Sequence, residues 1–134
     1  MDNKSKWFEF SVSEDYKLVD LGRTAIFLIP MGKLNFKMNS GQTVAEHLRE
    51  FLSDEFGAFT TPSVASHGVY VNDDKVVYQD ECQIYEVSFL GKERIPMLMK
   101  KLAEIATAIG EECIYLRAGQ YSSLVVPKQQ KTNL

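Results

Sequence analysis

Hydrophobic residues in two parts of the chain recur every three or four positions, which predicts two amphipathic helices. The first predicted helix begins at Thr43, because Thr43-Val-Ala-Glu46 has the form of a capping box, and it ends at Gly57. The second covers residues 92–109, and Pro96 is tolerated in its first turn, where a missing N–H costs no helical bond. The apolar faces contain Val44, Leu48, Phe51, Leu52 and Phe56 in the first helix and Ile95, Leu98, Met99, Leu102, Ile105, Ala106 and Ile109 in the second.

Strands are predicted before, between and after the two helices. The segment Leu18–Met31 contains the first, with an uninterrupted apolar run that is typical of a strand in the middle of a sheet. Val64–Leu90 is expected to form a β-hairpin with its tip at Asn72-Asp73-Asp74, since Asn and Asp tolerate left-handed backbone. Cys113–Val126 is the last predicted strand, with a division expected at Gly119.

Counting residues leaves open which face of the return strand of this hairpin is buried. Cys82, Ile84, Glu86 and Ser88 lie on one face, and Gln83, Tyr85, Val87 and Phe89 lie on the other. The second set is the more apolar, so we expect it to face the helices.

The element order β-α-β-β-α-β predicts an α+β fold of the ferredoxin-like type, an antiparallel sheet with two helices on one face. Residues Trp7–Val12 are a candidate for an additional N-terminal edge strand. The length of 134 residues suits one domain covering 1–134, with flexible ends at 1–6 and 128–134.

Composition narrows the classes of function. The net charge of −3 disfavours binding to a polyanion such as a nucleic acid. A helix needs about 20 apolar residues to span a bilayer, and no apolar run approaches that length, so no transmembrane helix is predicted. The start of the chain lacks the apolar segment of a secretory signal, and the two cysteines, Cys82 and Cys113, do not form a CxxC pair. We therefore expect a cytoplasmic protein with two buried thiols.

Residues able to carry chemistry are few. A pocket between the sheet and the loop Phe56–His67 would have four polar groups around it: His67, Glu81, Glu86 and Arg117. His47 is expected to be exposed on the first helix, and Ser66 and His67 should point to opposite faces of a strand, so they form no dyad by themselves. A pair between His67 and one of the two cysteines stays an alternative.

Acidic residues concentrate near the tip of the hairpin, at Asp73, Asp74, Asp80 and Glu81. Such residues are common in turns for backbone reasons, so we expect solvated charge and no metal site. No glycine-rich phosphate loop is present, and no cofactor is expected.

The aromatic residues favour a protein interface. Candidates for it are Trp7, Phe8, Tyr70, Tyr78, Tyr85, Tyr115 and Tyr121. The sheet face that carries no helix would need a cover, and a homodimer or another protein partner would supply it.

A motif in the centre of the chain adds a resemblance. Phe56-Gly-Ala-Phe-Thr60, Gly68-Val-Tyr70 and Glu81-x-x-x-Tyr85-Glu-Val87 together resemble a pattern in small bacterial and phage proteins. In that pattern the helix ends in Phe-Gly-Gly-x-Thr and a Gly-Trp hairpin follows, so the chain departs from it at Ala58 and at Val69 or Tyr70. The resemblance implies the ferredoxin-like fold and brings no activity with it.

These observations favour a non-catalytic binding or regulatory protein that acts through protein–protein contacts, such as a phage or mobile-element inhibitor of a host factor. The first alternative is a small-molecule- or nucleotide-handling enzyme with a pocket near His67. The second is a nucleic-acid-binding module, which requires five basic residues to gather on one side: Arg94, Lys100, Lys101, Arg117 and Lys128.

Overall fold

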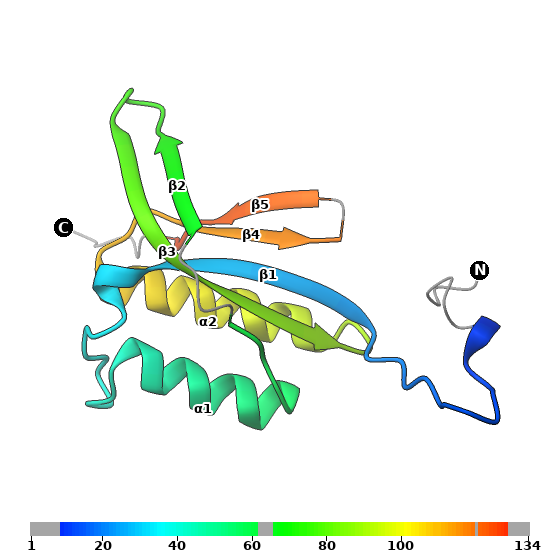
Figure 1. Ribbon diagram of the computed structural model, residues 1–134. Coiled ribbons are helices and arrows are strands. Elements are labelled where there is room, and N and C mark those ends of the chain that lie inside the picture. Colours follow the sequence, from blue (N-terminus) through cyan, green and yellow to red (C-terminus); the bar gives the residue numbers. More distant parts are fainter. Residues whose placement is uncertain (1–8, 62–65, 120, 129–134) are drawn as a thin grey trace.

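The computed structural model describes residues 9–61, 66–119 and 121–128, with backbone only at 66–68 and 78–80. Within these residues, one antiparallel sheet is covered on one face by two α-helices (Figure 1). The strands are β1 (Arg23–Pro30), β2 (Ser66–Val71), β3 (Val77–Phe89), β4 (Ile114–Ala118) and β5 (Tyr121–Val125). The helices are α1 (Val44–Phe56) and α2 (Arg94–Ile109), with a short 3-10 turn, η2 (Met31–Lys33), after β1. The α+β class, the antiparallel sheet and the placement of both helices on one face are confirmed.

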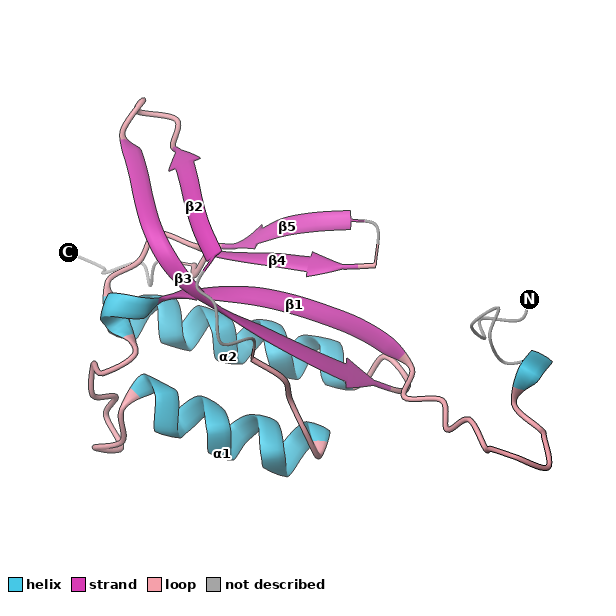
Figure 2. Ribbon diagram, in the orientation of Figure 1, coloured by secondary structure: helices cyan, strands magenta, loops and turns pink. Residues whose placement is uncertain are grey.

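The strands lie in the order β2-β3-β1-β4-β5, so β1 is central. Phe27 of β1 is opposite Tyr85 of β3 on one side and Leu116 of β4 on the other. Strand β3 is 13 residues long, and its first half pairs with β2 while its second half pairs with β1. The outer part of the β2–β3 hairpin stands up from the sheet on the side away from the helices (Figure 2).

Both helices begin and end where the sequence predicts, to within two residues. The Thr43 hydroxyl accepts from the Glu46 amide at 3.1 Å, and the Glu46 carboxylate accepts from the Thr43 amide at 2.9 Å, which completes the capping box. Gly57 ends α1 and Gly110 ends α2, both in the left-handed conformation that glycine adopts without strain.

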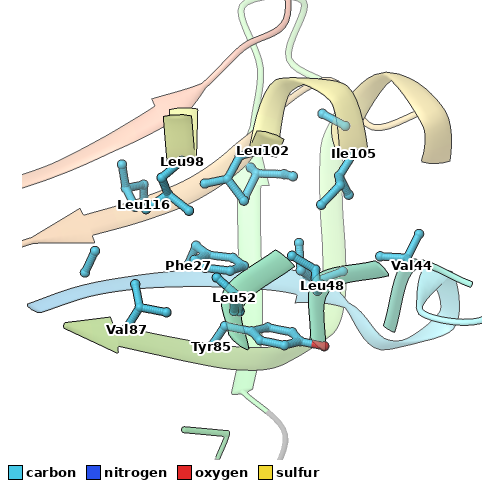
Figure 3. Close-up of a cluster of buried hydrophobic side chains, with 14 of the residues drawn as sticks. Phe27, Val44, Leu48, Leu52, Tyr85, Val87, Leu98, Leu102, Ile105 and Leu116 are labelled. Carbon is cyan, nitrogen blue, oxygen red and sulfur yellow. The ribbon is translucent and has the colours of Figure 1, made fainter. Parts of the chain in front are cut away.

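The core lies between the sheet and the helices (Figure 3). The Phe27 and Tyr85 rings stack at 5.2 Å between centroids, and leucines of α1 and α2 pack over them. The expectation that the set containing Tyr85 and Val87 faces the helices is confirmed, since both are buried. Tyr85 is therefore a core residue, and its assignment to an interface was wrong.

The additional N-terminal edge strand is absent from the described residues. Trp7 and Phe8 lie outside them, as do residues 1–6 and 129–134, for which flexible ends were predicted. Val12 makes only an isolated bridge to Lys17, and this part of the chain leads away from the sheet (Figure 1). The fifth strand is β5 instead, because Gly119, with φ of 63°, allows the chain to reverse and pair back on β4.

Candidate functional site

The sheet face opposite the helices carries a cavity of about 290 Å³, here called the open-face cavity. Its floor comes from Leu28 and Pro30 of β1 and from Cys82 of β3. The raised β2–β3 hairpin forms one wall, and β4 and β5 form another. The loop between α2 and β4 closes one end. The lining residues outside the floor are Val69, Tyr70, Glu111, Glu112, Cys113, Tyr115 and Leu124.

Two contacts hold the hairpin against the α2–β4 loop. Asn72 donates from Nδ2 to Glu112 Oε2 at 3.2 Å, and Tyr70 hydrogen-bonds Cys113. The Asn72 side chain also accepts from the Asp74 and Val76 amides at 2.9 and 3.0 Å, which shapes the hairpin tip. The Asn72 side chain therefore both shapes the turn at the hairpin tip and links the hairpin to the α2–β4 loop.

The chemistry of the cavity is set by two tyrosine rings and two carboxylates on mostly apolar walls. Tyr115 lines the cavity and is 37% exposed, so part of its side chain is accessible to a ligand. Glu112 is exposed, while Glu111 is half-buried at the end of α2. Apolar walls with a few converging polar groups are typical of small-molecule sites.

Cys113 is unsuited to act as a nucleophile. Burial, assisted by the nearby Glu112 and Glu111 carboxylates, raises the pKa of its thiol, and the hydrogen bond from Tyr70 opposes this only in part. The thiol therefore stays protonated at neutral pH, and only the thiolate is a strong nucleophile. The alternative of a cysteine–histidine pair thus has no support at Cys113.

Two of the four predicted ligand-binding residues share the face of the cavity. Glu86 and Arg117 flank Ile26 in one row across β3, β1 and β4. Both side chains are exposed. The Glu86 backbone is held at both its amide and its carbonyl by Thr60, each at 2.9 Å.

The other two lie elsewhere. The His67 backbone is opposite Glu81 in the β2–β3 pairing, and the His67 side chain is outside the described residues. Glu81 and Glu86 are five positions apart on one strand, so their side chains leave opposite faces. The structure therefore brings Glu86 and Arg117 together on one face and leaves Glu81 apart from them.

The remaining predicted residues are dispersed. Tyr70 and Tyr115 line the open-face cavity, the Tyr78 side chain is not described, and Tyr121 is 73% exposed on the helix side of β5. Whether the chain forms a homodimer stays a prediction.

Arg117 lies on the open face whereas Arg94, Lys100 and Lys101 belong to α2 on the other side, so the five basic residues do not gather.

A second hollow, of about 510 Å³, lies between α2 and the end of the β4–β5 hairpin. It is lined by Phe89, Met99, Leu116 and Tyr121, with Arg23 as its charged residue. The open-face cavity is lined by two carboxylates and this hollow by one arginine. The two sites therefore favour ligands of opposite charge.

The part of the chain that the structure describes contains neither a candidate metal site nor a membrane-spanning helix. No group of three or more histidine, cysteine or acidic side chains there could hold a metal ion. No described helix has the length and hydrophobicity to cross a bilayer.

Sequence reasoning did not identify the α2–β4 loop as part of a site. Glu111 and Glu112 follow Gly110 directly, and the Glu111 amide donates to the Ala106 carbonyl at 2.9 Å. This bond closes the end of α2, and the two acidic residues there line the open-face cavity. The sequence does carry a signal for this loop. Glu111 and Glu112 follow a glycine that ends a helix and precede a strand, and residues in such a position lie at the end of a sheet.

Comparison with solved structures finds two chains of similar fold. No protein-family model and no curated sequence matches the chain. A structure of a phage SAM lyase in complex with S-methyl-5′-thioadenosine is similar over 89% of this chain and 100% of that chain, with a TM-score of 0.56 and 15% identity. A phage SAM lyase in the apo state is similar over 82% of this chain and 93% of that chain, with a TM-score of 0.50 and 14% identity. At these identities the likeness shows a shared fold.

The expectation of a non-catalytic protein that acts through protein–protein contacts was wrong, because both structures of similar fold are of an enzyme. That expectation rested on the lack of a compact catalytic motif in the sequence. The lining of the open-face cavity comes from three separate parts of the sequence, residues 28–30, 69–82 and 111–124, so no single local motif contains the whole site. The comparison favours the first alternative, an enzyme that handles a small molecule or nucleotide.

Proposed function

We propose that this protein is a SAM lyase, which binds S-adenosylmethionine in the open-face cavity and cleaves it to S-methyl-5′-thioadenosine. The observation that carries the proposal is the fold shared with the phage SAM lyase structures over most of both chains. We also propose that β1 to β4 with α1 and α2 form a ferredoxin-like arrangement. The support for it is the strand order β2-β3-β1-β4 with both helices on one face.

The lining of the cavity suits the adenosine and sulfonium parts of this substrate. Adenine stacks well on an aromatic ring, and the Tyr115 ring is accessible on β4. The sulfonium group carries a positive charge, which Glu111 and Glu112 attract and which the face of the Tyr70 ring also favours. The same lining would repel an anionic ligand such as a nucleoside triphosphate.

The reaction follows from the structures of substrate and product. Methylthioadenosine keeps the methyl group, the sulfur and the 5′-deoxyadenosyl group, so the bond that breaks joins sulfur to the γ-carbon of the amino-acid chain. Its electron pair stays on sulfur, which becomes a neutral thioether. Without water, the four-carbon fragment has two routes. Its own carboxylate oxygen can bond to the γ-carbon as sulfur leaves, which gives a lactone and uses up the negative charge of the carboxylate. Alternatively, a base takes a β-proton and the electron pair of that C–H bond forms a double bond to the γ-carbon, which gives an alkene that is an isomer of the neutral lactone.

The apolar walls of the cavity contribute to this step. The sulfonium charge disappears as the bond breaks, and an apolar environment favours a reaction that removes charge relative to water. Leu28, Pro30 and Leu124 supply that environment, while the exposed Glu112 at the edge serves capture of the cation.

The test is to incubate the purified protein with S-adenosylmethionine and to follow methylthioadenosine by chromatography with ultraviolet detection. We expect formation of methylthioadenosine and stabilisation of the protein by it in thermal melts. Tyr115→Ala should weaken its binding by about 5-fold to over 100-fold, because stacking of a base on an aromatic ring is worth about 1–3 kcal/mol. Asp54→Asn, on the exposed side of α1, is the matched control and should change nothing.

Absence of both product formation and binding in the folded wild-type protein would refute the proposal. If binding occurs and Tyr115→Ala leaves it unchanged, the site lies elsewhere on the molecule.

A further inference from the structure

The face of the sheet that carries the cavity has few charged residues. Adjacent positions point to opposite faces, so this face of β1, β4 and β5 and of the half of β3 beside β1 consists of alternate residues. Most of them are uncharged, such as Thr24, Ile26, Leu28 and Ser88. Glu86 and Arg117 are the charged residues among them, and they are of opposite sign.

The register fixes how these two residues are arranged. Both are opposite Ile26, Glu86 from β3 and Arg117 from β4. Strands lie about 4.8 Å apart, which separates the two Cα atoms by about 10 Å across the row. Within the described residues, neither Glu86 nor Arg117 makes an ion pair. The side-chain ion pair found there joins Lys101 to Glu104. A carboxylate and a guanidinium group, of opposite charge, thus face solvent on either side of the apolar Ile26.

This row is next to the open-face cavity. Leu28, on its floor, is two residues from Ile26 on the same strand, and Tyr115, on its wall, is two residues from Arg117. Two residues of a strand cover about 6.6 Å. A ligand whose adenosine lies in the cavity therefore reaches the row with a chain of a few atoms.

We propose that Glu86 and Arg117 form a subsite for an α-amino acid zwitterion, in which Glu86 accepts from the α-ammonium group and Arg117 binds the α-carboxylate. This rests on the proposed function and extends it to the four-carbon end of the substrate. A guanidinium group binds a carboxylate through two parallel N–H donors, and a carboxylate accepts from an ammonium group. Ile26 between them would contact the methylene groups of the chain.

This subsite gives the enzyme a means to distinguish substrate from product. S-adenosylmethionine carries the amino-acid chain, and methylthioadenosine lacks it. Once the sulfur–carbon bond is broken, the two halves are no longer held at both ends, so each dissociates separately. The two backbone hydrogen bonds between Glu86 and Thr60 fix the strand from which the Glu86 side chain projects.

The test compares two non-reacting ligands, S-adenosylhomocysteine, which retains the amino-acid chain on a neutral sulfur, and methylthioadenosine. Their dissociation constants are measured by calorimetry for wild type, Glu86→Gln and Arg117→Gln. Each variant should bind S-adenosylhomocysteine at least 10-fold more weakly and methylthioadenosine within 2-fold of wild type. Arg117→Lys should recover part of the loss, and Ser88→Ala, on the same face in the row beyond, is the control.

The two ligands distinguish failure of the subsite from failure of the proposed function. If wild type binds both ligands and the variants weaken both equally or neither, the subsite is overturned while the cavity assignment stands. If folded wild type binds neither ligand, the proposed function fails and the subsite fails with it. Thermal melts of each variant verify that it is folded, which is expected because both side chains are exposed.

Discussion

The ammonium group of Lys101 lies 2.9 Å from Nε2 of His47, and this contact joins α2 to α1 on the helical side of the protein. Lysine can only donate, so Nε2 must accept and the proton of the neutral ring is on Nδ1. Nδ1 in turn lies 3.4 Å from the Gln42 side-chain oxygen. Lys101 also pairs with Glu104 at 3.0 Å and lies over the Phe51 ring.

This arrangement predicts a dependence of stability on pH. Burial, followed by the positive charge of Lys101, lowers the pKa of His47, while Glu104 and Glu50 oppose the shift. The unfolded chain then binds more protons than the folded one between the ordinary value of 6.5 and the lowered value. The free energy of unfolding should therefore be highest above pH 6.5 and fall as the pH drops through that interval.

His47→Gln should remove this part of the pH dependence, because glutamine does not titrate and its side-chain oxygen can still accept from Lys101. The measurement is a series of denaturant titrations from pH 7.5 to pH 5 on wild type and the variant. Parallel curves for the two proteins would show that His47 does not couple to folding.

Gly22 supports a prediction about backbone sterics. Its φ is 86°, and an added Cβ would lie 2.0 Å from the Phe89 carbonyl oxygen, so Gly22→Ala must displace the start of β1 or the end of β3. Gly41 has a similar φ of 89° but open space around it. Gly41→Ala should cost about 1–2 kcal/mol, the ordinary price of left-handed backbone, and Gly22→Ala should cost distinctly more. Chemical denaturation of both variants measures the difference, and equal losses would contradict the close approach.

The sequence predicts most of the fold because its signals are local. The capping box at Thr43 and the glycines after each helix act within a few residues, and the alternation of Tyr85, Val87 and Phe89 shows which face of β3 is apolar. Residues 113–126 were predicted as one strand divided at Gly119, and the structure places that division between β4 and β5, which pair as a hairpin.

The candidate site was predicted less well because it depends on which strands become neighbours. Glu86 and Arg117 are 31 positions apart, and only the register with Ile26 places them in one row. Likewise, Glu112 meets Asn72 because the hairpin stands over the α2–β4 loop, a tertiary contact without a local pattern. Glu86 and Arg117 were therefore identified from their residue type, and the predicted group of four is brought together only in part.

The thiol of Cys113 should react slowly with alkylating reagents. Burial and two carboxylates raise its pKa above the ordinary value of 9.0, so the reactive thiolate is scarcer than on a free cysteine. With Cys82→Ala as background, labelling by iodoacetamide at pH 7.5 should be slower than that of free cysteine by mass spectrometry. Tyr70→Phe removes the hydrogen bond that favours the thiolate, and it should slow labelling further unless it also exposes the thiol. Labelling as fast as free cysteine at pH 7.5 would contradict this assignment.

The Asn72 side chain has two separable roles, and a matched pair of variants distinguishes them. Its oxygen organises the hairpin tip through the Asp74 and Val76 amides, while its nitrogen donates to Glu112. Asn72→Asp keeps an acceptor for the tip but places two carboxylates together, so the hairpin should separate from the α2–β4 loop at neutral pH. Hydrogen exchange should then show continued protection at the Asp74 and Val76 amides, whereas Asn72→Ala should lose it.

Separation of the hairpin from the loop would also open the cavity. An exposed contact of this kind is worth up to about 1 kcal/mol, so Asn72→Asp should weaken methylthioadenosine binding by up to about 5-fold at pH 7.5. Adding Glu112→Gln to Asn72→Asp should restore binding at pH 7.5 by supplying a donor. If Asn72→Asp binds as tightly as wild type while the tip stays protected, the Asn72–Glu112 contact does not shape the cavity.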